Sequence, residues 1–257
     1  MDIRHAAEML WEAEKNVKAI GRLTDIYPEM TLGDAYEIQR ATMKKRLQEG
    51  QQPVGMKIGL TSAGMQALLG VHEPDFGYLT DTMLIREGEP CRISSLIAPR
   101  VEAELSFCLK KDLQGPGVTI ADVYAATAYV VPSLEIVDSR IKDWDVKLFD
   151  TIADNGSAAG FVLGSGMRKI EDVDMRLTGM VFEKNGKLMN SGVTAEVFGN
   201  PAAAVAWLAN TLSMHGEGLK AGQIIMAGAV TVALPAAAGD AFTASFYGCG
   251  SVSIRFE

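Results

Sequence analysis

The sequence predicts a mainly β protein of the α+β class, in which a mixed, rolled sheet is accompanied by a few helices. Most periodic segments are short runs of alternating or β-branched apolar residues, bounded by Gly, Pro, Asn or Asp, as is typical of strands. Helical spacing is confined to a few segments, and these do not alternate with strands as they do in βαβ folds. The sequence contains neither a nucleotide-binding fingerprint nor an internal repeat.

Composition limits the classes of partner. A chain of 257 residues can bury a large core. Its net charge of -8 argues against nucleic acid or an anionic membrane as the main partner. The chain has no apolar run of membrane-spanning length, no signal-peptide pattern at the N-terminus, and only three widely spaced cysteines. We therefore expect a cytoplasmic protein with reduced thiols and no membrane partner.

The first part of the chain is helical. Apolar residues recur at helical spacing over residues 2–20. Thr31 and Asp34 form a capping-box pattern that starts a second helix, which should stop near Gly50. We expect residues 1–52 to form a helical arm or cap and residues 53–257 to form the mainly β body.

The sequence of residues 53–61 predicts a short strand interrupted by glycines. Glycines within a strand indicate that a ligand or another segment of the chain approaches the backbone closely. Lys57 has apolar neighbours there, so it either reaches solvent or sits at a site with a lowered pKa. A short helix is predicted from Ser62 through Leu69. Residues 71–81 read as a loop, in which Asp75 is either a turn-forming residue or a functional acid.

Two glutamates share one face of the next strand. Apolar and polar residues alternate over residues 98–109, and residues two apart in a strand point to the same side. Glu102 and Glu104 therefore present two carboxylates side by side. These could simply face water, which is the commoner state of Glu.

A third acid interrupts an apolar, β-branched strand at residues 130–137. A buried carboxylate is costly unless it is paired or binds a metal. Glu135 could therefore form an ion pair, with Arg140 or Arg100 as the candidate partner. Alternatively, it joins Glu102 and Glu104 around a hard divalent cation such as Mg²⁺ or Mn²⁺.

The remaining elements follow in order. A capped helix is expected after Thr119, an amphipathic segment at 144–149, a polar turn at 154–157 and a strand at 160–164. Asn185-Gly186 predicts a hairpin between strands at 177–183 and from 188 onward. Pro201 starts a helix that ends before Gly216, and strands are expected at 223–227, 241–246 and 251–256.

Six motifs occur in order along the chain: Lys57-Ile-Gly-Leu-Thr61, Glu73-Pro-Asp-Phe-Gly77, Pro99-Arg-Val-Glu-Ala-Glu104, Leu134-Glu-Ile-Val-Asp-Ser-Arg140, Ile152-Ala-Asp-Asn155 and Gly222-Gln-Ile-Ile225. Together they resemble the hydratase and decarboxylase branch of the fumarylacetoacetate hydrolase superfamily. This branch contains the 2-hydroxypenta-2,4-dienoate (2-oxopent-4-enoate) hydratases and the 4-oxalocrotonate decarboxylases. The resemblance covers almost the whole chain and implies the superfamily's mixed rolled β-sheet fold.

The resemblance also implies a site and an activity. Glu102, Glu104 and Glu135 match the family's Mg²⁺/Mn²⁺ ligands, Lys57 and Asp75 are the expected catalytic residues, and Leu60, Thr61 and Ser157 are expected substrate contacts. Asp75 in Pro-Asp-Phe-Gly resembles the hydratases, whereas an uncharged residue is typical of the decarboxylases. One departure is Gly156-Ser157-Ala158, where many hydratases have Ala-Ser-Cys.

The expected reaction is metal-dependent addition of water to a small 2-oxo or 2-enol acid, within meta-cleavage degradation of aromatic compounds. A cation beside Lys57 should depress its pKa, because like charge and burial both disfavour the ammonium form. The alternatives are a decarboxylase that acts on 4-oxalocrotonate (2-oxo-3-hexenedioate), a hydratase for a longer dicarboxylate, an acylpyruvate hydrolase, or a non-catalytic partner of such an enzyme. A homo-oligomer is expected, with a complex with the sister 4-oxalocrotonate decarboxylase as a further expectation.

Overall fold

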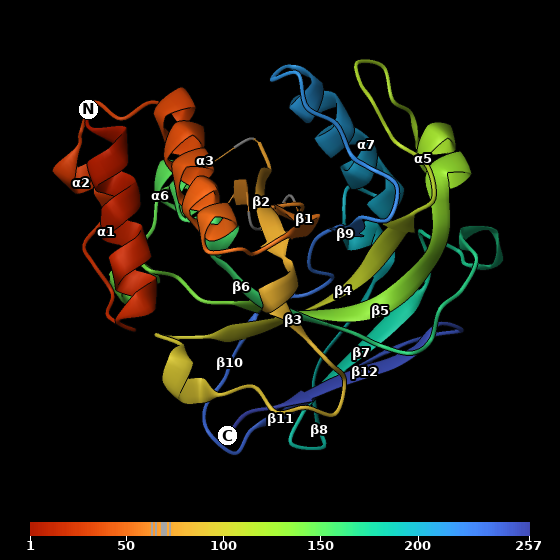
Figure 1. The fold of residues 1–257 in the computed structure, drawn as a ribbon. Coiled ribbons are helices and arrows are strands. Elements are labelled where there is room, and N and C mark those ends of the chain that lie inside the picture. Colours follow the sequence, from red (N-terminus) through yellow and green to blue (C-terminus); the bar gives the residue numbers. More distant parts are fainter. Residues whose placement is uncertain (63, 65, 68–70, 72) are drawn as a thin grey trace.

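The protein is built around one large mixed sheet, as the computed structural model shows for residues 1–62, 64, 66–67, 71 and 73–257. Within these residues its strands follow the order β2-β1-β9-β4-β5-β6-β3, and β10 pairs with β4 (Figure 1). The strand bounds are β1 Pro53–Gly59, β2 Asp75–Thr80, β3 Leu84–Ile85, β4 Arg100–Leu109, β5 Thr127–Val137, β6 Ala158–Leu163, β9 Ile224–Met226 and β10 Leu234–Pro235.

A second, four-stranded sheet has the order β12-β11-β7-β8. Its bounds are β7 Gly179–Lys184, β8 Lys187–Val193, β11 Ala241–Phe246 and β12 Gly250–Arg255. Asn185 and Gly186 link β7 to β8, and both have positive φ, at 54° and 71°. This is the backbone that a two-residue hairpin turn needs, so the hairpin prediction is confirmed.

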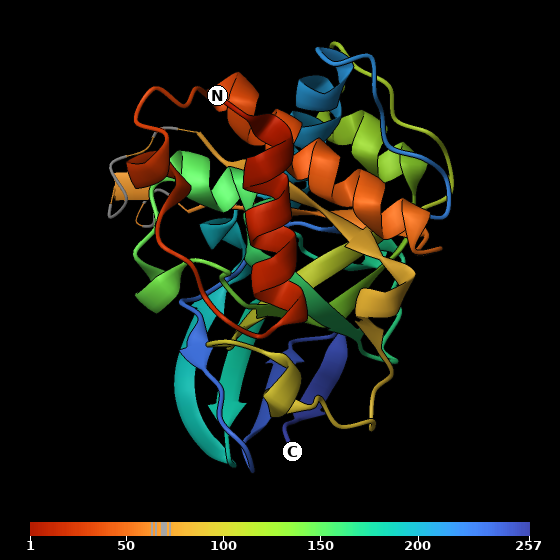
Figure 2. The same ribbon diagram turned by 60° about the vertical axis from the view of Figure 1, so that its left-hand side comes forward.

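The helices gather on the side of the molecule opposite the small sheet, as Figures 1 and 2 show from two directions. The predicted capping boxes at Thr31 and Thr119 are present, each closed by an Asp three residues later. The bounds are α1 Ile3–Lys15, α2 Leu23–Ile26, α3 Leu32–Gln48, α5 Ile120–Ala126, α6 Leu148–Ala153 and α7 Pro201–Ser213, with short 3-10 segments at η1 Asp81–Met83, η2 Ile93–Ser95, η3 Lys142–Trp144, η4 Asn155–Ser157, η5 Ile170–Asp172 and η6 Thr194–Glu196. None of the described helices combines the length and apolar character that a membrane crossing requires.

One main hydrophobic core joins the N-terminal helices to the sheet. Leu10 of α1 and Ile38 of α3 belong to the same buried cluster as Leu105 and Phe107 of β4. The mixed α+β class and the rolled sheet are thus confirmed. The division into an arm of residues 1–52 and a body of residues 53–257 stays a prediction.

Two predicted elements differ from the structure. The helix expected over residues 2–20 ends at Lys15. The loop expected over residues 71–81 is wrong for its second half, because Asp75–Thr80 is strand β2, paired antiparallel with β1. Gly77 suggested a turn, but a Cβ there would lie 2.3 Å from the Asn155 carbonyl oxygen, so this glycine marks a close backbone approach. Most of the short helix predicted after Ser62 lies outside the described residues.

Strand β9 explains where a site can form. It has three residues and lies between β1 and β4, pairing Met226 with Lys57 on one side and with Ser106 on the other. Beyond Met226 the chain leaves this ladder at Gly228, which has a φ of 116°. The end of β1 and the first half of β4 are therefore not bridged by a strand, and their side chains can meet across the gap.

Candidate metal centre and active site

Three carboxylates meet on β4 and β5. Glu102 lies opposite Glu135 in the antiparallel ladder, and Glu104 follows two residues later on the same face as Glu102. One carboxylate oxygen from each lies within 4.8 Å of the others. Glu104 and Glu135 are fully buried, whereas Glu102 is half-buried. The structure thus brings together the three predicted ligands.

The cluster has buried oxygen atoms that accept no hydrogen bond from the described residues. Glu104 Oε2 accepts a 2.9 Å hydrogen bond from the Gly228 backbone N–H, but Glu104 Oε1 and both oxygens of Glu135 accept none from any described residue. Burial, followed by the charge of Glu102, raises the pKa of Glu104 to about 8. Burial also raises the pKa of Glu135 well above its usual value, with Lys57 acting against it.

These observations fit a hard divalent cation. Carboxylate oxygens are the ligands that Mg²⁺, Mn²⁺ and Ca²⁺ prefer, and a bound cation would satisfy the unpartnered atoms and offset their mutual repulsion. Without such a positive charge, keeping three carboxyl groups this close in a largely buried site costs free energy.

Lys57 lies beside the cluster and is almost fully buried. Its ammonium donates a 2.9 Å hydrogen bond to the Gly156 carbonyl and lies 3.4 Å from Glu135 Oε1. Glu135 therefore contacts Lys57, and neither arginine that the sequence offered as an ion-pair partner. Burial lowers the pKa of Lys57, but Glu135, Asp75 and the other two glutamates outweigh it and raise that pKa. Without a cation, these four carboxyl groups thus raise the pKa of Lys57, and the depression expected beside a bound cation stays a prediction.

Asp75, at the start of β2, is 2% exposed. Thr151 Oγ1 donates a 3.1 Å hydrogen bond to its Oδ2, while Oδ1 accepts none from the described residues. A Cβ at Gly59 would lie 2.1 Å from Asp75 Oδ1 and 3.3 Å from Lys57 Nζ. The absence of a side chain at Gly59 therefore lets these two groups lie close to the backbone of β1.

A turn of three left-handed residues holds Lys57 from the other side. Asn155, Gly156 and Ser157 have φ values of 58°, 59° and 56°. The Asn155 side chain bonds to both backbone groups of Tyr78, and the Ser157 hydroxyl donates to Asp154, which in turn pairs with buried Arg140. These contacts offset the cost of the left-handed backbone and fix the Gly156 carbonyl that accepts from Lys57.

A cavity of about 540 Å³ opens over this arrangement. Lys57, Asp75 and Glu102 reach it, and so do the predicted substrate contacts Leu60, Thr61 and Ser157. Much of its remaining wall comes from residues 58–59, 62, 143–144, 146 and 229–233. The cavity joins the predicted catalytic residues to one edge of the carboxylate cluster.

The comparison with known families agrees with this geometry. A sequence-family model described as fumarylacetoacetate (FAA) hydrolase C-terminal matches residues 60–257 of the chain. The chain belongs to the fumarylacetoacetate hydrolase family.

Similar proteins fall within the expected branch of that family. A protein of Comamonas testosteroni named 2-hydroxyhexa-2,4-dienoate hydratase is 46% identical, over 99% of this chain and 97% of its own. A 2-hydroxypent-2,4-dienoate hydratase of Pseudomonas putida is 47% identical, over 83% of this chain and 97% of its own. A solved structure, the 4-oxalocrotonate decarboxylase of Pseudomonas putida G7 in complex with magnesium and adipate, is 42% identical with a TM-score of 0.97, and the match covers 99% of this chain and 97% of that one.

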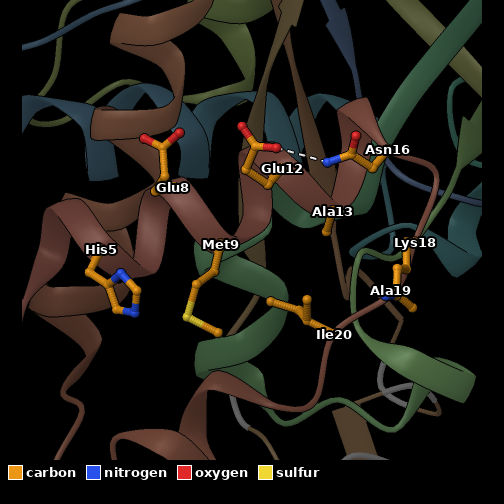
Figure 3. Close-up of a pocket in the computed structure, with 9 residues that line it drawn as sticks. All are labelled: His5, Glu8, Met9, Glu12, Ala13, Asn16, Lys18, Ala19 and Ile20. Carbon is orange, nitrogen blue, oxygen red and sulfur yellow. Dashed lines mark hydrogen bonds between the residues drawn. The ribbon is translucent and has the colours of Figure 1, made fainter.

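This member of the fumarylacetoacetate hydrolase family has a second hollow, of about 360 Å³, lined by α1 and by residues 18–20 (Figure 3). Met9, Ala13, Ala19 and Ile20 give it an apolar floor, and the Asn16 amide donates a hydrogen bond to Glu12 at its rim. It contains none of the predicted site residues. The carboxylate cavity therefore remains the candidate active site.

Sequence reasoning missed several residues of the fumarylacetoacetate hydrolase site. Thr151 orients Asp75, Gly228 donates to Glu104, and Trp144 forms part of the cavity wall. Arg100 also lines the cavity, although the sequence offered it only as a partner for Glu135. Thr151, Trp144 and Gly228 come from segments remote in sequence from the groups they contact, so no local pattern signals their roles.

Proposed function

We propose that the protein is a metal-dependent hydratase that adds water to 2-hydroxypenta-2,4-dienoate and yields 4-hydroxy-2-oxopentanoate, in meta-cleavage degradation of aromatic compounds. The observation that carries this proposal is the meeting of three carboxylates, two of them fully buried, with Lys57 and Asp75 beside one cavity. The hydratase names of the similar proteins support the same activity.

Glu102, Glu104 and Glu135 are the proposed ligands of Mg²⁺ or Mn²⁺. Glu104 Oε1 and both oxygens of Glu135 accept no hydrogen bond from the described residues, so they are the buried atoms that such a cation would bind. When bound, the cation would act as a Lewis acid for negative charge on the C2 oxygen of the substrate.

Asp75 and Lys57 are the proposed proton-transfer residues. The dienol must first ketonise, losing its C2 hydroxyl proton and gaining one at C5. Asp75 Oδ1, free beside Gly59, is suited to move that proton and then to take one from the water that attacks C4. The Lys57 ammonium is suited to deliver a proton at C3, which completes the addition of water.

Leu60, Thr61 and Ser157 are the proposed substrate contacts, because all three line the cavity. A homo-oligomer, a complex with the sister 4-oxalocrotonate decarboxylase and a cytoplasmic location belong to the same proposal. The three free cysteines agree with a reducing compartment.

Decarboxylation of 4-oxalocrotonate is the second candidate, since a 42% identical structure bears that name. Stabilisation of the same enolate would serve loss of CO2. The acid at position 75, buried and held by Thr151, favours the hydratase because hydration needs a group that handles water and protons.

The test is NMR of freshly generated 2-hydroxypenta-2,4-dienoate in D2O, with protein and Mg²⁺ or Mn²⁺. We expect metal-dependent formation of 4-hydroxy-2-oxopentanoate with deuterium at C3 and C5. Chelator-treated protein and substrate alone control for spontaneous ketonisation. Release of CO2 from 4-oxalocrotonate, without hydration of the dienoate, would instead establish the decarboxylase.

A further inference from the structure

Arg100 is a charged side chain at the cavity that the proposed mechanism does not use. It begins β4 and lies on the same strand face as Glu102 and Glu104. The side chain is half-buried, yet its guanidinium donates no hydrogen bond to any described residue and forms no ion pair with one. Five N–H donors in a planar fork are therefore available to a ligand.

Trp144 fixes the plane of this fork. The guanidinium carbon of Arg100 lies 4.3 Å from the centre of the Trp144 ring. The indole N–H donates a 2.8 Å hydrogen bond to the Ala98 carbonyl, two residues before Arg100. Asp143 and Trp144 have φ values of 59° and 56°. Neither residue is glycine, so this left-handed backbone costs free energy at two consecutive positions. The stacked side chains of Arg100 and Trp144 are therefore a fixed part of the cavity wall.

The position of Arg100 along β4 shows where it lies relative to the carboxylate cluster and to Lys57. Lys57 lies at the level of Ser106, through the pairing of both residues with Met226. The Lys57 ammonium reaches Glu135, which lies opposite Glu102, whereas Arg100 pairs with Val137 and lies on the far side of Glu102 from Glu104. Asp75 pairs with Gly59 and borders the same space as Lys57. Lys57 and Asp75 therefore approach the carboxylate cluster from β1 and β2, and Arg100 flanks it at the start of β4, beyond Glu102.

We propose that Arg100 binds the C1 carboxylate of the 2-oxo acid substrate through two parallel N–H contacts, and that Trp144 is the positioning residue for this fork. The assignment rests on the proposed function, because carbons C3 to C5 must face Lys57 and Asp75. A substrate held at C2 beside the glutamates then directs its carboxylate toward Arg100. Bidentate pairing of a planar guanidinium with a carboxylate is a strong, oriented contact.

The test measures binding of the unreactive analogue 2-oxopentanoate, and of its neutral amide 2-oxopentanamide, to the Mg²⁺-loaded protein by calorimetry. Arg100→Gln should weaken binding of the acid about tenfold to a hundredfold, as expected for loss of a charged hydrogen bond. Binding of the amide should change little, and Mg²⁺ affinity should be kept or rise, because a positive charge beside Glu102 is removed. Arg100→Lys should recover part of the loss, since lysine restores charge without the fork.

Arg86→Gln is the matched control, because it removes an exposed arginine outside the cavity. Trp144→Leu should reduce binding of the acid less than Arg100→Gln does. Equal losses for acid and amide in Arg100→Gln would show a merely structural role and overturn the proposal. So would unchanged binding of 2-oxopentanoate together with weaker binding of 2-oxohexanedioate, which would place a distal carboxylate at Arg100.

These binding measurements require no turnover. If the wild-type protein fails to hydrate the dienoate, the proposed function is wrong, while the comparison of acid with amide still decides the role of Arg100. If hydration occurs and Arg100→Gln discriminates acid from amide no differently from the wild type, only the assignment of Arg100 fails.

Discussion

At the scale of single residues, the two oxygens of Asp75 differ. Oδ2 accepts a hydrogen bond from Thr151, whereas Oδ1 accepts none from the described residues and borders the space beside Gly59 and Lys57. One oxygen is thus used to orient the carboxylate, and the other is left for chemistry. This division is typical of a positioned acid or base.

Asp75→Asn should therefore lower turnover by about a hundredfold to ten-thousandfold, the usual contribution of a proton-transfer group. The amide can keep the contact with Thr151 but cannot exchange the proton. Steady-state kinetics of dienoate hydration, with parallel titrations of Mn²⁺ and 2-oxopentanoate, check this, and both affinities should change only a few-fold. Asp172→Asn, an exposed position outside the cavity, is the control. Near-wild-type turnover in Asp75→Asn would remove Asp75 from the mechanism.

The three predicted metal ligands carry a local physical signal, whereas the roles of Lys57, Asp75, Leu60, Thr61 and Ser157 came from the family resemblance. Glu102 and Glu104 follow from the two-residue period of a strand, and Glu135 from an acid in an apolar run. Thr151 carries no such signal, because its role exists only once α6 packs beside β2. The raised pKa of Lys57 without a cation also has no local signal, since it depends on the positions of four carboxyl groups.

At the scale of elements, the left-handed turn Asn155–Ser157 is the support of Lys57. Strand β2 and helix α3 support it in turn, because buried Gln39 donates to the carbonyls of Phe76 and Ile152 on both sides. The asparagine side chain and the Asp154–Arg140 pair lock the turn against the sheet. The position of Lys57 thus depends on an element outside the two strands that carry the predicted metal ligands.

Gly156→Ala tests this support. A Cβ at Gly156 would lie 3.1 Å from Lys57 Cδ, and the residue has a φ of 59°. We expect a loss of about 1–2 kcal/mol of stability from the left-handed backbone, together with lower turnover from displacement of Lys57. Urea unfolding and steady-state kinetics give the two quantities.

Gly186→Ala is the matched control, because Gly186 has a φ of 71° in the β7–β8 hairpin and a Cβ there would meet nothing within 4 Å. It should show a similar loss of stability with unchanged turnover. If both variants keep full turnover, the contact between the turn and Lys57 does not matter for catalysis.

Strand β2 shows why an element can escape sequence reasoning. Pro74, Asp75 and Gly77 are residues typical of turns, so the local pattern predicted a loop. Pairing with β1, burial of Phe76 against Tyr36 with ring centres 4.7 Å apart, and the approach of Asn155 to Gly77 all come from tertiary packing. The insertion of β9 between β1 and β4 likewise has no local signal.

At the scale of the whole molecule, the site joins β1, β2, β4 and β5, and its charges enter the stability of the fold. Burial raises the pKa of Glu104 from 4.5 to about 8 and that of Asp154 from 3.8 to about 6. A carboxyl with a raised pKa in the folded state stabilises the fold below its unfolded pKa. That contribution is lost as pH rises through the folded value.

Chelator-treated protein should therefore lose stability as pH rises from about 5 to about 8, as thermal unfolding at a series of pH values would show. Saturating Mg²⁺, at about a hundred times its dissociation constant, should add roughly 2.7 kcal/mol at the higher pH. Glu104→Gln should flatten the pH dependence of the chelated protein, because it removes one titrating group. A metal-free stability that rises over this range would contradict the arrangement of the buried carboxylates.

The crowding of Glu102, Glu104 and Glu135 also makes capture of the cation a competition with protons. Acids whose pKa values are raised by burial hold protons near neutrality, and these must leave before the oxygens can bind a divalent ion. The apparent affinity for the ion should thus weaken as the solution becomes more acidic. How much of the protein carries its ion would then follow the acidity of its surroundings as well as the supply of the ion.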